Sequence, residues 1–325
     1  MSGETMRVAR LHGVGDVRIE QLGIPQPAPG ELLVRIEACG VCPTDARKFA
    51  IGVNDGEYPF NPGHEWVGRV AAVGSEVIGW EPGARVYGDT YAGYAEYATI
   101  AARSSGWSRG ALAVGELPVE RAVFVEPLAD CLHCVLDQGA VGPGSRVAVM
   151  GLGAMGVQLV AVAARVGADV LAVEPRAERR ELAARFGAAA AAEPAAWRDV
   201  AAGRWDGAGP DVVIVAVAAA ALAAEAIAAC APGGRVVLFA GFGDDGVAQV
   251  DLNRIHYQEI ALVGSEWVGT PPHQRLEHYE TARDLLASEE LPLEQLVTDR
   301  TGFEGLEAAL YAVREQRSLK TVLLP

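Results

Sequence analysis

The chain has few cysteines and fewer basic than acidic side chains. Both features narrow the class of protein to which it can belong. The five cysteines, Cys39, Cys42, Cys131, Cys134 and Cys230, are too few and too scattered for a disulfide framework, which favours a reducing cytoplasm. There are 27 Lys and Arg residues against 42 Asp and Glu, so the net charge is -15. An acidic surface of this kind argues against nucleic acid or an anionic membrane as the main partner.

Marks of targeting or membrane insertion are also missing. Residues 1–5 contain no basic region and no apolar core follows them, so no secretory signal is expected. The apolar run from 147 to 164 resembles a membrane span on hydropathy alone, but it contains Gly151, Gly153 and Gly156. These glycines indicate a strand, a tight turn and a helix instead. We therefore expect a cytoplasmic protein without a membrane partner.

The 325 residues are enough for two domains of ordinary size. The first part predicts short strands separated by glycine and proline. After about Pro127, a helical segment is followed by strands that alternate with helices, which predicts a parallel sheet covered on both faces. A closing strand is expected to return to the first part. The predicted strands are 6–11, 31–36, 66–74, 93–100, 146–150, 169–173, 211–217, 235–239, 260–264 and 320–324.

A Gly-x-Gly-x-x-Gly motif follows the strand predicted at 146–150 and opens a helix. The first glycine permits the tight turn, the second lets the backbone approach a pyrophosphate, and the third allows the helix to pack closely on the strand. The helix N-terminus then offers free N–H groups and a positive dipole end to the phosphates. The predicted cofactor-binding residues in this turn are Gly151, Leu152, Gly153, Ala154, Met155 and Gly156.

Glu174 ends the next predicted strand, close to the spacing expected for an acid that binds ribose. A carboxylate there accepts hydrogen bonds from the adenosine ribose and repels a 2′-phosphate, which favours NAD. Arg176, Arg179 and Arg180 argue the other way, because they could attract that phosphate. We expect NAD to be the cofactor and keep NADP as the less favoured alternative.

The segments Cys42-Pro43-Thr44-Asp45 and Gly63-His64-Glu65 bring together sulfur, imidazole and carboxylate groups. This combination of ligand atoms suits zinc better than magnesium or calcium. A single cysteine and a single histidine with a distant third ligand would leave a coordination position open for chemistry. Taken one at a time, Cys42 reads as a small buried hydrophobe and His64 as a satisfied core or surface histidine.

Together with a set of further motifs, these residues resemble the zinc-dependent medium-chain alcohol and polyol dehydrogenases. The motifs are Cys39–Asp45, Pro62–Glu65, Gly93–Tyr97, Glu126–Leu128, Gly151–Gly156, Pro232–Arg235, Gly264–Ser265 and Lys320. The resemblance implies an α/β chain with two domains. Residues 1–127 and 269–325 would form a GroES-like, mainly β catalytic domain, and residues 128–268 a Rossmann domain with a doubly wound parallel sheet.

The resemblance also implies a set of zinc ligands. The first ligand matches Cys42, not Cys39, and the second matches His64. Glu126 occupies the third position, as in the sorbitol, threonine and aminocyclitol dehydrogenase branch, and would act directly or through water. Glu65 matches a carboxylate that can join or leave the metal. Glu126 alone would read as an acid favoured at a helix N-terminus.

Zinc would then act as a Lewis acid on a secondary alcohol, either a polyol, a cyclitol or a sugar-like molecule, whose alkoxide gives a hydride to NAD and leaves a ketone. Thr44 would hydrogen-bond the substrate oxygen and pass on its proton, and Asp45 would orient the ligating histidine. Outside the family, both would read as ordinary turn residues. Arg47 stands where many members carry a histidine, so water or a ribose hydroxyl would have to complete the proton path.

One further departure from the family pattern and two alternative functions remain. No cysteine lies between Tyr87 and Tyr97, where many members carry a four-cysteine lobe, so one catalytic zinc and no structural zinc is expected. The family implies a homodimer through the sheet edge near Ile260–Ser265, or a homotetramer. Trp66, Tyr91 and Trp107 could line a substrate cleft, although ordinary packing is the simpler interpretation. The alternative functions are a zinc-independent enone or quinone reductase and a non-catalytic NAD(H)-binding protein.

Overall fold

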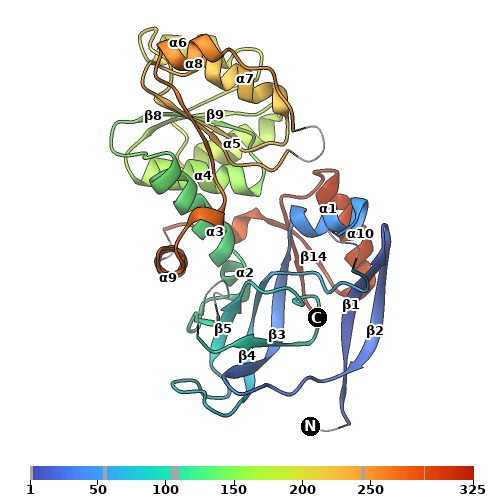
Figure 1. The fold of residues 1–325 in the computed structure, drawn as a ribbon. Coiled ribbons are helices and arrows are strands. Elements are labelled where there is room, and N and C mark those ends of the chain that lie inside the picture. The colour runs from blue at the N-terminus through green and yellow to red at the C-terminus, as the bar shows by residue number, and fades with distance from the viewer. Residues whose placement is uncertain (1–2, 54–56, 104–109, 243–245, 289) are drawn as a thin grey trace. The chain divides into compact units, whose positions relative to one another are not determined.

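A computed structural model describes residues 3–53, 57–103, 110–242, 246–288 and 290–325 (Figure 1). The chain forms two compact units, one made of Met1–Pro127 with Thr270–Pro325 and the other of Leu128–Gly269. A mainly β unit and a unit with a parallel sheet confirm the predicted fold class. No helix in the described ranges is long and apolar enough to cross a membrane, and the apolar run after 147 is divided into a strand, a turn and a helix.

The first unit is built on a seven-stranded sheet in the order β14-β15-β3-β4-β5-β7, with β6 also paired to β3. A separate antiparallel hairpin of β1 and β2 completes its strands. The strands are β1 (Thr5–Gly13), β2 (Asp16–Gly23), β3 (Glu31–Val41), β4 (Glu65–Val73), β5 (Arg85–Gly88), β6 (Tyr97–Ala101), β7 (Leu112–Ala113), β14 (Val297–Thr301) and β15 (Lys320–Leu323).

Helices of the first unit occupy the connections between these strands. They are α1 (Pro43–Ile51), α2 (Val119–Ala122), α9 (Pro272–Ala287) and α10 (Leu306–Arg314), with 3₁₀ turns at Leu293–Leu296 and Phe303–Gly305. Helix α1 begins directly after β3, where Pro43 supplies a favourable first helical residue and Cys42 caps the amide of Thr44. The core of this unit packs α1 and α10 together and contains the fully buried Trp66.

In the second unit, six parallel strands lie in the order β10-β9-β8-β11-β12-β13. Helices α4 and α5 cover one face, and α7 and α8 cover the other (Figure 1). The strands are β8 (Arg146–Met150), β9 (Asp169–Val173), β10 (Ala190–Ala192), β11 (Val212–Val215), β12 (Arg235–Leu238) and β13 (Ala261–Gly264). The helices are α4 (Ala154–Arg165), α5 (Ala177–Arg185), α6 (Trp197–Arg204), α7 (Ala220–Ala229) and α8 (Leu252–Tyr257), with a 3₁₀ turn at Trp267–Gly269.

The chain order reverses between β8 and β11, which are neighbours in this sheet. In open α/β sheets, ligands bind beyond the carboxyl ends of the strands at such a switch point. The glycine-rich turn follows β8 at this place. The segment predicted as one helix before it consists of α3 (Val125–Leu132) and a wider π-helical turn (His133–Gln138).

Candidate active site

The pairing of β3 with β4 brings the two halves of the metal motif together. Gly40 lies opposite Glu65 in this antiparallel pair. Cys42 follows two residues beyond Gly40 and His64 precedes Glu65, so both residues leave the sheet at the same end. The register of two neighbouring strands therefore converts a separation of 22 residues in sequence into contact.

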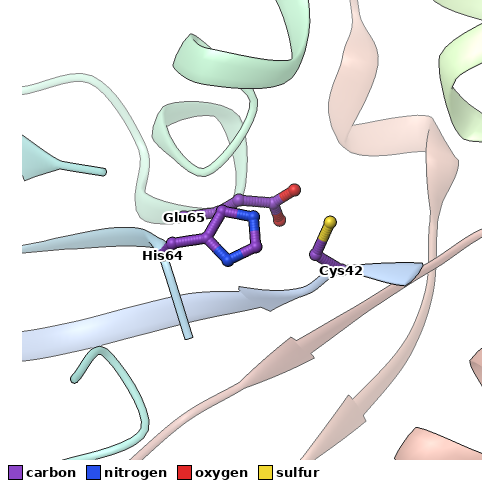
Figure 2. A group of neighbouring side chains, drawn as sticks. All are labelled: Cys42, His64 and Glu65. Carbon is purple, nitrogen blue, oxygen red and sulfur yellow. The ribbon is translucent and has the colours of Figure 1, made fainter. Parts of the chain in front are cut away.

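Side chains of Cys42, His64 and Glu65 form one group, which we call the metal group. One ligand atom from each lies within 4.8 Å of the other two (Figure 2). Cys42 comes from the start of α1, whereas His64 and Glu65 come from the start of β4. The three side chains point into a common space, so a single cation could contact all of them.

Asp45, which is fully buried, holds His64 in place. Its Oδ2 lies 3.3 Å from His64 Nδ1, a contact longer and less well aligned than a regular hydrogen bond, and this leaves Nε2 for a metal. The Tyr94 hydroxyl donates to the same Oδ2 at 3.0 Å, and the Gly63 amide donates to Oδ1 at 3.1 Å. A ligating histidine backed by a carboxylate is the usual arrangement around protein-bound metals.

Glu65 is paired with Lys320, the first residue of β15, in an ion pair that is almost fully buried. Gly40 lies between them on β3, and a Cβ atom at that position would collide with both side chains. Burial alone would lower the pKa of Lys320, but the Glu65 carboxylate and the nearby Cys42 raise it above its ordinary value. The lysine therefore stays charged and holds Glu65 at the edge of the metal group.

Burial and neighbouring charges also shift the other two members of the metal group. Burial raises the pKa of the Cys42 thiol, and the charge of Glu65 adds to the effect. For His64, burial works to lower the pKa, but Asp45 and Cys42 outweigh it and raise the pKa well above its ordinary value. Both shifts favour the protonated forms, and metal binding requires the release of such protons.

Glu126 stands in the first turn of α3 and is partly buried. Its carboxylate is not within the same 4.8 Å of the metal group, so the structure does not bring it into direct contact with all three side chains. Its charge nevertheless acts on the same region, because it helps to raise the pKa of the buried Tyr87, after burial itself. From this location, Glu126 could act on a metal through water or through its charge, but it does not already stand beside the other three side chains as a direct ligand would.

Thr44 is exposed on the first turn of α1, next to Cys42. Tyr91 packs edge-on against His64 with 5.3 Å between ring centroids and remains 43% exposed, so it borders the metal group. Trp66 is a core residue instead, and Trp107 lies outside the described residues. Arg47 is exposed on α1.

Each glycine of the nucleotide motif has a distinct environment. Gly151 has φ +94°, which permits the turn after β8. A Cβ atom on Gly153 would meet nothing within 4 Å, so the backbone at the start of α4 is open to a ligand. A Cβ atom on Gly156 would collide with the carbonyl of Gly151, so the helix can approach the turn only without a side chain. Ala154 and Met155 fill the first turn of α4, where the first amides of a helix have no partner within the helix.

Glu174 is buried at the end of β9 and reaches back to the glycine-rich turn. The Leu152 amide donates to its Oε2 at 2.9 Å, and the Arg176 amide donates to Oε1 at 3.2 Å. Arg180 donates to the carbonyls of Glu174 and Pro175, both at 2.8 Å. The carboxylate is thus fixed beside the turn, and Arg180 is engaged with the backbone.

Arg179 is also largely buried, on the first turns of α5. Burial lowers its pKa, and the charge of Arg176 lowers it further. The two arginines therefore concentrate positive charge beside Glu174, where the sequence predicts competition between a ribose hydroxyl and a 2′-phosphate.

Two residues that contribute to the metal group escaped the sequence analysis or received no role there. Tyr94 supports Asp45 from 49 positions away, and Lys320 neutralises Glu65 from 255 positions away. Both lie in family-like segments, Gly93–Tyr97 and the closing strand, but no local spacing connects them to the metal motif. Only the pairing of β15 with β3 brings Lys320 to it.

Comparison with known families matches both halves of the chain. The family described as alcohol dehydrogenase GroES-like domain matches residues 28–168, and the family described as zinc-binding dehydrogenase matches residues 151–288. A protein named probable alcohol dehydrogenase from Mycobacterium tuberculosis is 29% identical, with 97% of this chain and 96% of the relative covered. L-threonine 3-dehydrogenase from Pyrococcus abyssi is 27% identical, with 100% and 99% covered.

Solved structures agree with these relatives. A candidate zinc-binding dehydrogenase from Sinorhizobium meliloti, solved with NADP, superposes with a TM-score of 0.87 at 27% identity and covers 99% of this chain and 100% of its own. Fold and sequence together define an oxidoreductase of the alcohol dehydrogenase type. The chain belongs to the zinc-type medium-chain dehydrogenase family, as the motifs predict.

Proposed function

We propose that this protein is a zinc-dependent dehydrogenase that transfers a hydride from a secondary alcohol to NAD, giving a ketone, NADH and a proton. The observation that carries the proposal is the convergence of Cys42, His64 and Glu65 within 4.8 Å, with Asp45 behind the imidazole. Sulfur, nitrogen and carboxylate oxygen are the donor atoms that zinc prefers, and the second nitrogen of His64 has the supporting carboxylate that such sites need. The residues present therefore fit the metal.

Cys42, His64 and Glu65 would hold the ion, and Glu126 would complete the set directly or through water. A zinc ion bound there supplies Lewis acidity, which lowers the pKa of the substrate hydroxyl toward neutrality. Thr44 would hydrogen-bond the reacting oxygen and pass on its proton to water or a ribose hydroxyl. Asp45 and Tyr94 keep His64 oriented, and Lys320 offsets the charge of Glu65.

For the cofactor, the open backbone at Gly153 and the first turn of α4 would receive the pyrophosphate. Glu174 favours NAD over NADP, because its fixed carboxylate suits a ribose with free hydroxyls and repels a 2′-phosphate. The engagement of Arg180 with backbone carbonyls supports the same preference. Glu126, which resembles the third ligand of the sorbitol and aminocyclitol dehydrogenase branch, makes a polyol, a cyclitol or a sugar-like alcohol the substrate class to test first. Relatives named alcohol and threonine dehydrogenases support an alcohol as the hydride donor.

The test measures bound metal by elemental analysis and the reduction of NAD with a panel of polyols and cyclitols. We expect about one zinc per chain, and we expect Cys42→Ser to lose both metal and activity. Cys39→Ala is the matched control, because Cys39 is a buried cysteine three residues away that is not part of the metal group. A folded, metal-free protein that reduces enones or quinones would overturn the proposal, and so would tight NADH binding without any turnover.

A further inference from the structure

Lysine is almost absent from this chain. Only Lys48 and Lys320 are lysines among the 27 basic residues. Lys320 pairs with Glu65 at the metal group. Lys48 lies on α1, four residues after Thr44. Residues four apart on a helix share one face, with Cβ atoms about 5–6 Å apart. The side chain proposed to bind the reacting oxygen and the second lysine are therefore neighbours.

Two aromatic rings lie close to the Lys48 ammonium. It lies 5.3 Å from the ring centroid of Phe60 and 5.5 Å from that of Tyr91. The two rings also pack edge to face with 5.0 Å between centroids. Because Tyr91 is in turn 5.3 Å from the His64 ring, two contacts of this length connect the ammonium to the metal group.

Lys48 is half-buried, yet no carboxylate in the described part of the chain comes within 4.0 Å of its ammonium. Other cations of the first unit, such as Arg85 and Arg121, are paired with glutamates. Cation–π contacts at partly exposed sites contribute about 0.5–1 kcal/mol each, less than a charge-assisted hydrogen bond to an anion. The protein has 42 acidic residues, yet none of those that the structure describes pairs with the cation at this position beside the metal group.

We propose that Lys48 binds an anionic group of the substrate, a carboxylate or a phosphate, so that the oxidised alcohol carries negative charge a few bonds from its hydroxyl. This inference rests on the proposed function and narrows its substrate class. Thr44 would hold the hydroxyl, Tyr91 would form the wall between the two ends of the substrate, and Lys48 would hold the anion. The compact ammonium suits this place, because it fits over two ring faces and keeps donors for a ligand.

Matched pairs of alcohols test the inference. One pair is 3-hydroxybutyrate and 1,3-butanediol, which differ in a carboxylate against a hydroxymethyl group. The other is sorbitol 6-phosphate and sorbitol, and comparison of the pairs separates carboxylate from phosphate. In one of the two pairs, we expect the anionic alcohol to have a higher kcat/KM than its neutral counterpart. Lys48→Met should lower that value about tenfold or more, mainly through KM, because one charge-assisted hydrogen bond is lost.

Two further variants control for effects on the fold. Lys48→Arg keeps the charge and should restore most of the preference for the anion. Arg47→Met removes the neighbouring exposed cation of α1, which has no aromatic contact in the described structure, and should leave the preference unchanged. In Lys48→Met, kcat/KM should fall more for the anionic member of a pair than for the neutral one, so that their ratio changes. Arg47→Met should leave both values within about twofold of wild type.

Because the chain has only two lysines, binding of an anion at Lys48 can be followed by the signal of its labelled amine. Reductive methylation with ¹³C-formaldehyde keeps the charge of an amine and labels Lys48 in solution, whereas Lys320 is buried. The signal is assigned by its absence in Lys48→Met. Addition of 3-hydroxybutyrate or sorbitol 6-phosphate should shift this signal, and addition of 1,3-butanediol or sorbitol should not.

Outcomes for the two proposals are separable. Oxidation of neutral alcohols with zinc and NAD, together with no preference for anions and no shift of the Lys48 signal, would overturn this inference and leave the proposed function standing. If no alcohol is oxidised, the proposed function fails. The Lys48 signal then still decides whether the site takes an anion.

Discussion

The hydroxyl of Tyr94 donates a 3.0 Å hydrogen bond to Oδ2 of Asp45, the carboxylate oxygen that also faces His64. Both partners are fully buried, so neither can exchange this bond for water. A tyrosine behind the carboxylate fixes the carboxylate, and the carboxylate fixes the histidine. The orientation of His64 thus depends on a residue that is not itself part of the metal group.

Tyr94→Phe should weaken zinc binding and lower the free energy of unfolding. The variant leaves a buried carboxylate short of one donor, at a cost of about 1–3 kcal/mol. Loss of a supporting partner around a metal site lowers affinity by about tenfold or more. Chelator competition measures the first effect and denaturant unfolding the second.

Tyr87→Phe is the matched control for this prediction. Tyr87 is as deeply buried as Tyr94, but its hydroxyl has no hydrogen-bond partner among the residues that the structure describes. Its removal should be neutral or stabilising. Equal losses of stability in the two variants would show that the Tyr94 hydroxyl contributes only as a buried polar group and has no special effect on Asp45.

Lys320→Met should strongly destabilise the first unit, because it leaves Glu65 charged and buried without a partner. Breaking a buried pair from one side costs about 3–5 kcal/mol. Adding Glu65→Gln should recover much of this loss, since no uncompensated charge then remains. A double-mutant cycle in denaturant measures the coupling, and additive effects would contradict the importance of this pair.

Glu174→Gln should reduce the preference for NADH over NADPH. The amide no longer repels a 2′-phosphate, and it accepts ribose hydroxyls less well than a carboxylate. Fluorescence titration with both cofactors measures the ratio, for which we expect a change of about tenfold. Glu181→Gln removes the same charge from an exposed site on α5 and should leave the ratio unchanged. A wild-type chain that binds NADPH more tightly would contradict the role given to Glu174.

The free edge of β13 is the expected site of self-association. The amides of Ala261 and Ser265 donate to backbone carbonyls at β12. Because amides alternate in direction along a strand, the amide of Leu262 faces away from β12. Leu262 is 42% exposed. Leu262→Pro removes only an outward amide and should reduce a dimer or tetramer to a smaller species. Light scattering after size-exclusion chromatography measures the mass. A wild-type mass of 34.0 kDa, that of one chain, would contradict self-association through β13.

Much of the second unit could be predicted from sequence, because its signals are local. Strands β8 and β9 have the predicted bounds, since each is a short apolar run, followed by Gly151 after β8 and by a charged residue and a proline after β9. The glycines of the nucleotide turn were identified for the same reason. Their spacing, with an apolar run before it and a helical pattern after it, indicates a strand, a turn and a helix.

The first unit was less predictable, because its local structure depends on distant partners. The strand expected at 93–100 begins only at Tyr97, since Gly93 and Tyr94 bond instead to the carbonyls of Gly63 and Pro62. Helix α1 is missing from the predicted elements because Cys42–Asp45 also fits a turn. Its proline at the first helical position was the available signal. Tyr94 and Lys320 reach the metal group only through the tertiary fold.

The place of β15 in the sheet affects the order in which parts of the chain can fold during synthesis. Domains generally fold as units during synthesis, and the whole second unit, residues 128–269, leaves the ribosome before Lys320 is made. Until then, Glu65 lacks its counter-charge and β3 lacks a neighbour. The nascent chain therefore completes residues 128–269 first, and the metal group obtains the counter-charge of Glu65 only after β15 has been made.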